Sequence, residues 1–285
     1  MTAIDIEACK VWIGRSTEEV DLITPRLLAE YRMTFDPFLA DVPGLEVPLG
    51  FHWCLSPLLA PMRELGPDGH PEKGGFLPPV PLPRRMWAGG AIDYHGDLRP
   101  GDQVRRRSII ASIDLKQGRS GPLCFVGVRH DYLTARGLAI SELQNIVYRE
   151  APSAEKNDAA PAVAADVAGT IDALESCWTV NPTPTMLFRY SAVTFNGHRI
   201  HYDYPYATAK EGYPALVVNG GIASVMLLEL FRTAAAREPR SVTARNVAPL
   251  FCGRPLHLRG ARDGTSWTLW AEDDDNKVAL EALVE

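Results

Sequence analysis

The sequence predicts an α+β fold of two fused halves, each with a central helix wrapped by a curled antiparallel sheet. A chain of 285 residues exceeds the commonest size of a single domain. A helical pattern followed by a meander of strands occurs twice, and an alanine-rich segment with two prolines separates the occurrences. Residues 1–150 are therefore predicted as the N-terminal half, 151–171 as a linker and 172–285 as the C-terminal half.

The C-terminal half has the clearer pattern. After Asn219, Gly220 and Gly221, apolar residues recur at helical spacing as far as about Ala236, which predicts a helix that begins at a glycine-rich turn. Short apolar or alternating runs separated by Gly and Asp clusters then predict antiparallel strands. These strands are expected at 245–250, 255–259, 267–271 and 278–284.

The N-terminal half repeats this order less distinctly. A helix is predicted at 51–65, although two prolines lie within it, and strands are predicted at 102–113, 123–134 and 138–149. The proline-rich stretch 76–83 is too stiff for either element. We expect it to form an irregular loop over a pocket or an interface.

Composition and charge exclude several classes of protein. The chain is 46% hydrophobic and 22% charged, as in folded globular proteins. A net charge of -6 with scattered basic residues disfavours nucleic acid as a partner. No run reaches the roughly 18 apolar residues of a membrane span. Acidic Asp5 and Glu7, where a secretory signal is basic, and five widely spaced cysteines without a C-x-x-C pair predict a cytoplasmic protein with reduced thiols.

The stretch 189–207 carries the functional signal. It contains two His, two Arg, one Asn, one Asp and four Tyr, more polar groups than a packed strand or helix needs. It resembles the hydratase signature of the MaoC-like, or enoyl-CoA hydratase type 2, family. The matching residues are Tyr190, Ser191, Val193, Thr194, Ile200 and His201, with Ala207 at the small-residue position.

This stretch departs from the general signature in three places. Phe195 replaces Gly, Asn196 replaces the catalytic Asp, and His198 with Arg199 replaces Asn-Pro. The pattern over 194–203 is instead similar to the branch of hydroxyacyl-thioester dehydratases and mesaconyl-CoA hydratases, in which Asn at this position is ordinary. The resemblance extends over 211–220, where relatives usually have His in the place of Asn219.

The resemblance implies a double hotdog fold and a hydro-lyase. Such an enzyme adds or removes water at the 2,3-position of an enoyl or 3-hydroxyacyl thioester of CoA or acyl carrier protein, here with a short branched or dicarboxylic acyl group such as mesaconyl. The site is expected in the C-terminal half, with a degenerate N-terminal half that shapes the acyl pocket. By analogy with other fused pairs, a homodimer is the expected assembly.

The same roles follow from the chemistry of the residues. His201 suits proton transfer because imidazole has a pKa of roughly 6.5, so that both forms are accessible near neutrality. Gly220 and Gly221 at a helix N-terminus offer free backbone N–H groups to the thioester oxygen. The amide of Asn196 is no base at neutral pH, so it is expected to orient the water.

Five further residues are expected to support the site. Arg199 could hold an acyl carboxylate or a CoA phosphate, or could pair with Asp203 to brace the loop. His198 is either functional or bonded to the loop backbone, while Tyr202, Asp203 and Asn219 are supporting residues. The remaining histidines, His52, His70, His95, His130 and His257, are expected to be packing or surface residues.

No metal or cofactor is expected. His198 and His201 lack a Cys or second carboxylate partner at metal-ligand spacing, and no nucleotide-binding glycine motif follows a strand. Two rival functions stay open on the hotdog architecture. One is an acyl-CoA thioesterase, and the other is a non-catalytic acyl-thioester binding protein, which the replacement of the acid by Asn196 makes conceivable.

Overall fold

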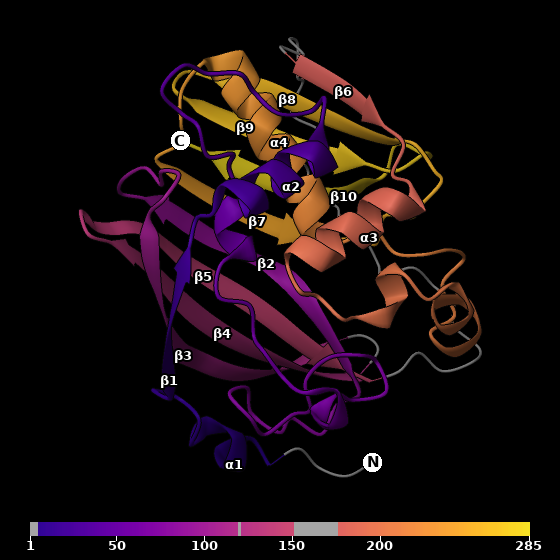
Figure 1. The fold of residues 1–285 in the computed structure, drawn as a ribbon. Helices are drawn as coiled ribbons and strands as arrows, with labels where there is room; N and C mark the ends of the chain where they lie inside the picture. Colours follow the sequence, from indigo (N-terminus) through magenta and orange to yellow (C-terminus); the bar gives the residue numbers. More distant parts are fainter. Residues whose placement is uncertain (1–4, 119–120, 151–175) are drawn as a thin grey trace.

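The computed structural model describes residues 5–118, 121–150 and 176–285, so the predicted linker at 151–171 lies outside the described residues. Its strands form one 10-stranded antiparallel sheet (Figure 1). The strands of the N-terminal half are β1 (Ser16–Leu22), β2 (Arg84–Tyr94), β3 (Gln103–Gly118), β4 (Gly121–Thr134) and β5 (Gly137–Arg149). Those of the C-terminal half are β6 (Ser176–Val180), β7 (Ser241–Asn246), β8 (Leu256–Asp263), β9 (Ser266–Glu272) and β10 (Val278–Val284).

The strand order shows an internal duplication. It runs β1-β3-β4-β5-β2 in the first half and continues β7-β10-β9-β8-β6 in the second, which is the same order reversed. The equivalent strands β2 and β7 pair at the junction, where Gly90 lies opposite Ala244. Each half therefore uses its second strand to extend the sheet of the other. The expected two-half architecture is confirmed, while the exact limits of the halves stay a prediction.

The helix of the C-terminal half is confirmed. Helix α4 (Gly220–Ala235) begins after Asn219 and packs against β6, β8 and β9. Its residues from Ile222 to Arg232 are all buried, so it fills one face of its sheet. The strand predicted at 245–250 is misplaced, because β7 ends at Asn246. Pro249, which has no N–H to donate to a ladder, follows in the departing chain.

The helix predicted at 51–65 is wrong. Only two short 3₁₀ turns occur there, Phe51–Cys54 and Met62–Glu64. Pro57 and Pro61 lie between them, and each proline removes a hydrogen-bond donor that a helix interior needs. The stretch 76–83 is irregular, as predicted. In the described part of the N-terminal half, no long helix crosses the sheet as α4 does in the other.

Two shorter helices mark equivalent places in the halves. Helices α2 (Pro25–Phe35) and α3 (Pro184–Val193) each follow the first strand of their half, and they pack against each other. Each begins with a Thr that caps the helix and a Pro in its first turn. The repeated Thr-Pro was a sequence signal for both helices. A short helix α1 (Ile6–Lys10) lies near the N-terminus, against β3.

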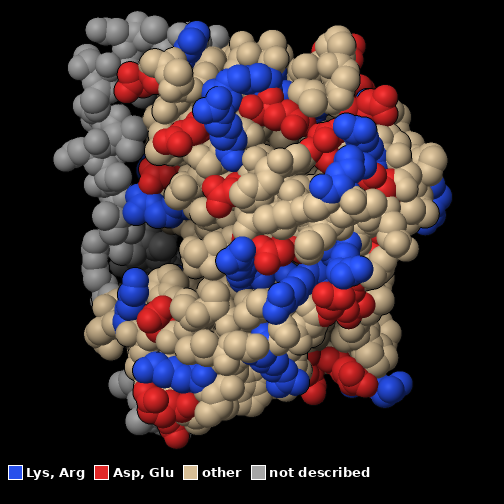
Figure 2. Space-filling model, turned by 90° about the vertical axis from the view of Figure 1, so that its left-hand side faces the viewer, with Lys and Arg blue, Asp and Glu red and all other residues tan. Residues whose placement is uncertain are grey.

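The surface charges and the cysteines of the structure agree with the expectations from the sequence. On the face formed by the first strands, basic and acidic side chains are interspersed (Figure 2), as the pair Arg105 and Glu18 on neighbouring strands illustrates. All five cysteines are unpaired. None of the helices in the described ranges is long and apolar enough to cross a membrane.

Candidate active site

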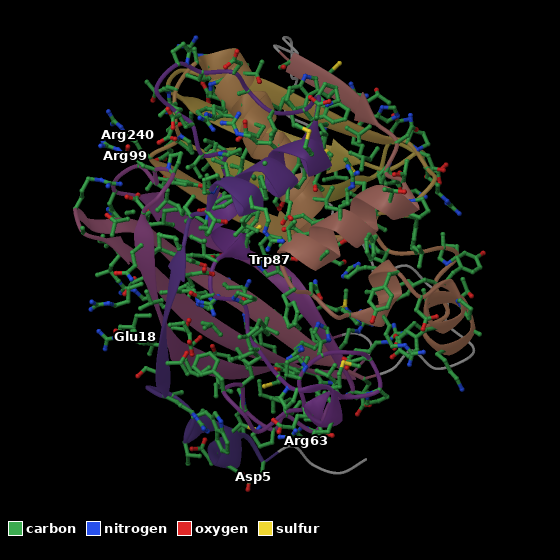
Figure 3. The ribbon with its side chains drawn as sticks, in the orientation of Figure 1. Asp5, Glu18, Arg63, Trp87, Arg99 and Arg240 are labelled. Atoms are coloured by element: carbon green, nitrogen blue, oxygen red, sulfur yellow. The ribbon has the colours of Figure 1, made fainter. Side chains whose placement is uncertain are left out.

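A cavity of about 1580 Å³ lies where the two halves meet. Trp87 on β2 is one of the residues that line it, and it lies near the middle of the molecule (Figure 3). The N-terminal half lines it with inward residues of β3, β4 and β5 and with Phe76 and Leu77 of the proline-rich loop. The C-terminal half lines it with Asn196, His201 and the start of α4. The predicted residues Asn196, His201, Gly220 and Gly221 therefore face a space to which both halves contribute.

His201 is held in one orientation by the backbone. It ends a 3₁₀ turn (Arg199–His201), and its Nδ1 lies 2.7 Å from the carbonyl oxygen of Val217. Because a carbonyl only accepts, Nδ1 carries the proton and Nε2 is left as a proton acceptor. Burial lowers the pKa of His201 to about 4, against the opposing effect of the Val217 carbonyl. The ring is therefore neutral near pH 7.

Asn196 lies in the loop between α3 and this turn. Its Oδ1 accepts the backbone N–H of His198 at 3.0 Å, and its own N–H donates to the carbonyl of Ser191. The preceding Phe195 has a φ of 51°, which turns the chain sharply. Since Oδ1 holds the loop, the amide NH₂ is the part of Asn196 that can donate to a molecule in the cavity.

Gly220 and Gly221 open α4 beside the cavity. Their N–H groups belong to the first turn, which has no carbonyl one turn earlier in the helix to bond. A Cβ on Gly221 would lie 1.9 Å from the hydroxyl oxygen of Tyr190, so a side chain there would collide with a buried tyrosine. Asn219 is buried and donates from Nδ2 to the Oγ of Ser191 at 3.3 Å. The helix start thus forms a fixed donor site.

Three of the predicted supporting residues brace the loop from outside the cavity. Arg199 pairs with Asp203, with Nη2 2.7 Å from Oδ2, and donates to the carbonyl of Pro67. Tyr202 is half exposed and donates to the carbonyl of Gly197. Of the two roles considered for Arg199, the structure has the pairing with Asp203.

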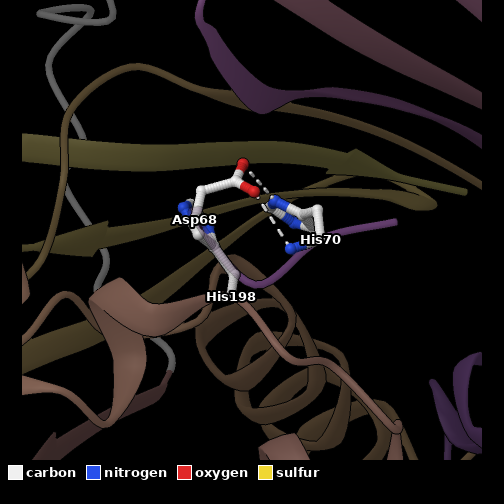
Figure 4. A group of neighbouring side chains, drawn as sticks. All are labelled: Asp68, His70 and His198. Carbon is white, nitrogen blue, oxygen red and sulfur yellow. Dashed lines mark hydrogen bonds and ion pairs between the residues drawn. The ribbon is translucent and has the colours of Figure 1, made fainter. Parts of the chain in front are cut away.

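The structure adds two residues, His70, which was expected to be a packing or surface residue, and Asp68, which the sequence had not pointed to. Asp68 and His70, from a loop of the N-terminal half, lie against His198 in the cavity wall (Figure 4). Nδ1 of His70 is 2.9 Å from Oδ2 of Asp68, and the rings of His70 and His198 have centroids 4.1 Å apart. For His70, the Asp two positions earlier, across a glycine, was the one local signal.

Burial and pairing together set the charges of this cluster. Burial alone would raise the pKa of Asp68, but hydrogen bonds from the ring and backbone of His70 outweigh it and hold that pKa below its usual range. Burial lowers the pKa of His70, against the raising effect of Asp68. Burial and the neighbouring His70 lower the pKa of His198 strongly. Asp68 is thus a carboxylate, while His198 is neutral.

The cluster also has the residue types of a metal site. Asp68, His70 and His198 each bring one ligand-type atom within 4.8 Å of the others, a proximity that sequence spacing did not predict. However, both carboxylate oxygens of Asp68 already accept hydrogen bonds from His70, one from the ring and one from the backbone N–H. This arrangement favours proton chemistry over coordination of an ion.

The architecture places the chain among the double hotdog proteins. It resembles the Mycobacterium tuberculosis protein described as having a double hotdog fold, with a TM-score of 0.55 and 11% identity over 95% of both chains. HtdX of the same organism is similar over 95% of this chain and 99% of its own, with a TM-score of 0.65 and 18% identity. At these identities the likeness shows the fold.

Sequence comparison gives the family within this class. Residues 50–252 match the model of hydroxyacyl-thioester dehydratase type 2. The chain is also 42% identical, over 275 residues and 96% of both chains, to mesaconyl-C(4)-CoA hydratase of Chloroflexus aurantiacus. The chain belongs to the hydroxyacyl-thioester dehydratase type 2 family. It is an enzyme that adds water to acyl thioesters or removes water from them.

Proposed function

We propose that this enzyme hydrates a short dicarboxylic enoyl thioester, with mesaconyl-C4-CoA as the representative substrate. The observation that carries this proposal is the 42% identity, over 96% of both chains, to the Chloroflexus hydratase of that name. The size of the cavity fits an acyl group together with part of its carrier. Coenzyme A is the proposed carrier, and an acyl carrier protein is the alternative.

His201 is the proposed base that activates the water. Its neutral Nε2 takes a proton from water while the water oxygen bonds to the β-carbon. The electrons of the double bond move toward the thioester oxygen, and the α-carbon then takes up a proton. The support is the Nδ1 contact with Val217, which fixes the tautomer, and the low pKa, which keeps the ring unprotonated.

Asn196 and the start of α4 are the proposed polar partners. The Asn196 NH₂ donates to the attacking water and so orients its lone pair, because Oδ1 is used by the loop. The N–H groups of Gly220 and Gly221 donate to the thioester oxygen as it gains negative charge, assisted by the positive end of the helix dipole. Asn219, the residue just before α4, is held in place by its hydrogen bond to Ser191 of α3.

Arg106 is the proposed partner of the free acyl carboxylate. It projects from β3 into the cavity, and its Nε is buried without a hydrogen-bond partner among the described residues. One of its terminal nitrogens lies 3.5 Å from the carbonyl of Leu55, and its side chain also hydrogen-bonds Tyr132. The nearby carboxylate of Glu142 is held by Trp53, at 3.0 Å, and faces His52 at 3.6 Å. Arg106 therefore has a donor available for a carboxylate of the substrate.

The compartment and the assembly of the enzyme are also proposed. The five unpaired cysteines support a reducing compartment such as the cytoplasm. A homodimer is the proposed assembly, to be checked by light scattering of the purified protein. The mixed charges on the face in Figure 2 agree with a small-molecule substrate rather than nucleic acid.

The test uses purified protein with mesaconyl-C4-CoA and with crotonyl-CoA, which lacks the carboxylate. Absorbance of the conjugated thioester and release of free thiol are followed together. Loss of conjugation without thiol, faster with mesaconyl-C4-CoA, supports the proposal. Equal or faster hydration of crotonyl-CoA contradicts the substrate class, and thiol release would indicate a thioesterase.

A further inference from the structure

The loop that carries Asp68 and His70 is docked onto the loop that carries the hydratase motif. The carbonyl of Asp68 accepts the N–H of Arg199 at 2.9 Å, and the carbonyl of Pro67 accepts from the Arg199 side chain. Gly69 and Gly197 touch there, because a Cβ on Gly69 would lie 2.0 Å from the carbonyl oxygen of Gly197. Gly69 also has a φ of 87°. The glycine contact and the hydrogen bonds fix Asp68 and His70 against the catalytic loop.

His70 and His201 are two imidazoles in one cavity with different partners on Nδ1. Nδ1 of His201 faces a neutral carbonyl, whereas Nδ1 of His70 faces the carboxylate of Asp68. The carboxylate of Asp68 favours the imidazolium of His70 and so opposes the effect of burial, which on balance lowers the pKa of His70. A carbonyl in a buried setting favours the imidazolium far less. His70 is also less buried, with 20% of its side chain exposed, so it can exchange protons with solvent.

Such a pair of environments is what hydration needs. One group must be unprotonated to activate water, and another must carry a proton for the α-carbon. Where the general signature has an Asp, this chain has Asn196, which is not an acid or base. Asp68 and His70 supply a titrating pair from the other half of the molecule.

We propose that His70, paired with Asp68, is the second proton-transfer residue of the active site and acts at the α-carbon. In hydration, water loses a proton to His201 as its oxygen bonds to the β-carbon, and the π electrons pass to the thioester oxygen. The imidazolium of His70 then gives its Nε2 proton to the α-carbon as the carbonyl re-forms. Proton exchange through the cavity water returns the proton of His201 to His70, so the net change is one water added.

Several charged or titratable groups surround His70 and enter its titration. Asp68 lies on its own loop, Arg85 on β2, and His198 and His201 on the catalytic loop. Arg199 borders the same loop contact. The charge of Asp68 acts to raise the pKa of Lys73, Tyr148 and Tyr206. Of these groups, Asp68 is the one bonded to the ring of His70.

The test compares His70→Gln and Asp68→Asn by the pH dependence of kcat, with whichever enoyl-CoA the wild type hydrates faster. This choice keeps the inference separate from the substrate class, although it rests on the proposed role of His201. His70→Gln should lower kcat at least ~100-fold with little change in KM. Asp68→Asn removes the charge that favours the imidazolium, so the alkaline limb of the profile should move to lower pH by about one unit.

Matched controls are His257→Gln and Asp263→Asn, two residues of β8 that do not line the cavity. Both should match the wild type. If His70→Gln keeps kcat, or if Asp68→Asn lowers kcat equally at every pH, the pair is structural and the proposal is overturned. It is also overturned if a chelator abolishes activity and Zn²⁺ restores it, because the cluster then binds an ion. If His201→Ala keeps normal activity while His70→Gln is inactive, the proposed role of His201 is overturned and that of His70 stands.

Discussion

The two halves share one strand order but differ in what covers the inner face of the sheet. In the C-terminal half, α4 packs across the strands and buries a continuous run of its residues. In the N-terminal half, the matching segment before β2 forms 3₁₀ turns and a proline-rich loop. Part of the space that a second helix would fill belongs to the cavity, which inward residues of β3, β4 and β5 line.

In the proposed function, this difference divides the work of the enzyme. The half with the helix supplies the donors of its N-terminus and the catalytic loop with His201. The half without it supplies room for the acyl group, Arg106 in the cavity wall and the loop with Asp68 and His70. A duplicated fold can therefore keep the helix in one copy and open the other copy for substrate.

The largest effect is expected from the C-terminal half, at His201. His201→Ala should lower kcat at least ~100-fold, because it removes the proposed base, and the melting temperature should change little. In the wild type, kcat/KM should fall as pH drops through about 4, where His201 takes up a proton and can no longer act as a base. Near-normal turnover of the variant, with His257→Ala as a control, would exclude His201 as the base.

The start of α4 should be nearly as sensitive, with an added loss of stability. Gly221→Val drives a side chain into the hydroxyl of Tyr190, so it should lower kcat and destabilise the fold by about 1–3 kcal/mol. Thermal denaturation and turnover measure the two effects. Combining Gly221→Ala with Tyr190→Phe removes the nearest clashing atom and should recover stability relative to Gly221→Ala alone. No recovery would place the strain elsewhere.

In the N-terminal half, the expected effect is on selectivity rather than on turnover. Arg106→Gln should raise KM for mesaconyl-C4-CoA about 10- to 100-fold, since a hydrogen bond to a charged group contributes about 1.5–3 kcal/mol. The KM for crotonyl-CoA should stay unchanged. Arg105→Gln is the matched control, because Arg105 is the preceding residue on β3 and faces solvent beside Glu18. Equal effects on both substrates would remove Arg106 from carboxylate binding.

Sequence alone predicts the C-terminal half better than the N-terminal half, for physical reasons. Helix α4 is apolar and free of proline, so its periodicity and its glycine-rich start predict it closely. At 51–65 the apolar pattern pointed to a helix, but two prolines removed the necessary donors. The duplication favoured a helix there, and the open cavity shows why the N-terminal half need not copy the helix of the C-terminal half.

The site shows the same division. His201, Asn196, Gly220 and Gly221 are close in the sequence or joined by one motif, and they line the same cavity. Asp68 and His70 reach the site only through tertiary packing of a loop from the other half. No local spacing could have predicted that contact. Arg199 was ambiguous in the sequence, because a cation beside a carboxylate can bind substrate or close an ion pair.

The smallest effect is expected at Asn196, where this chain departs from the general signature. Asn196→Asp keeps the bond to the His198 N–H through one oxygen and places a second carboxylate oxygen where the NH₂ was. The variant should retain kcat within about tenfold near neutral pH, because the carboxylate can act as a proton acceptor. Its negative charge also raises the pKa of His201, so the acid limb of kcat/KM should move from about 4 to higher pH. Asn196→Ala is the comparison, since it removes the donor to water and the brace of the loop, and should lower kcat more than it raises KM. If Asn196→Ala matches the wild type at every pH, Asn196 only shapes the loop, and the imidazoles of His201 and His70 carry out the proton transfers without it.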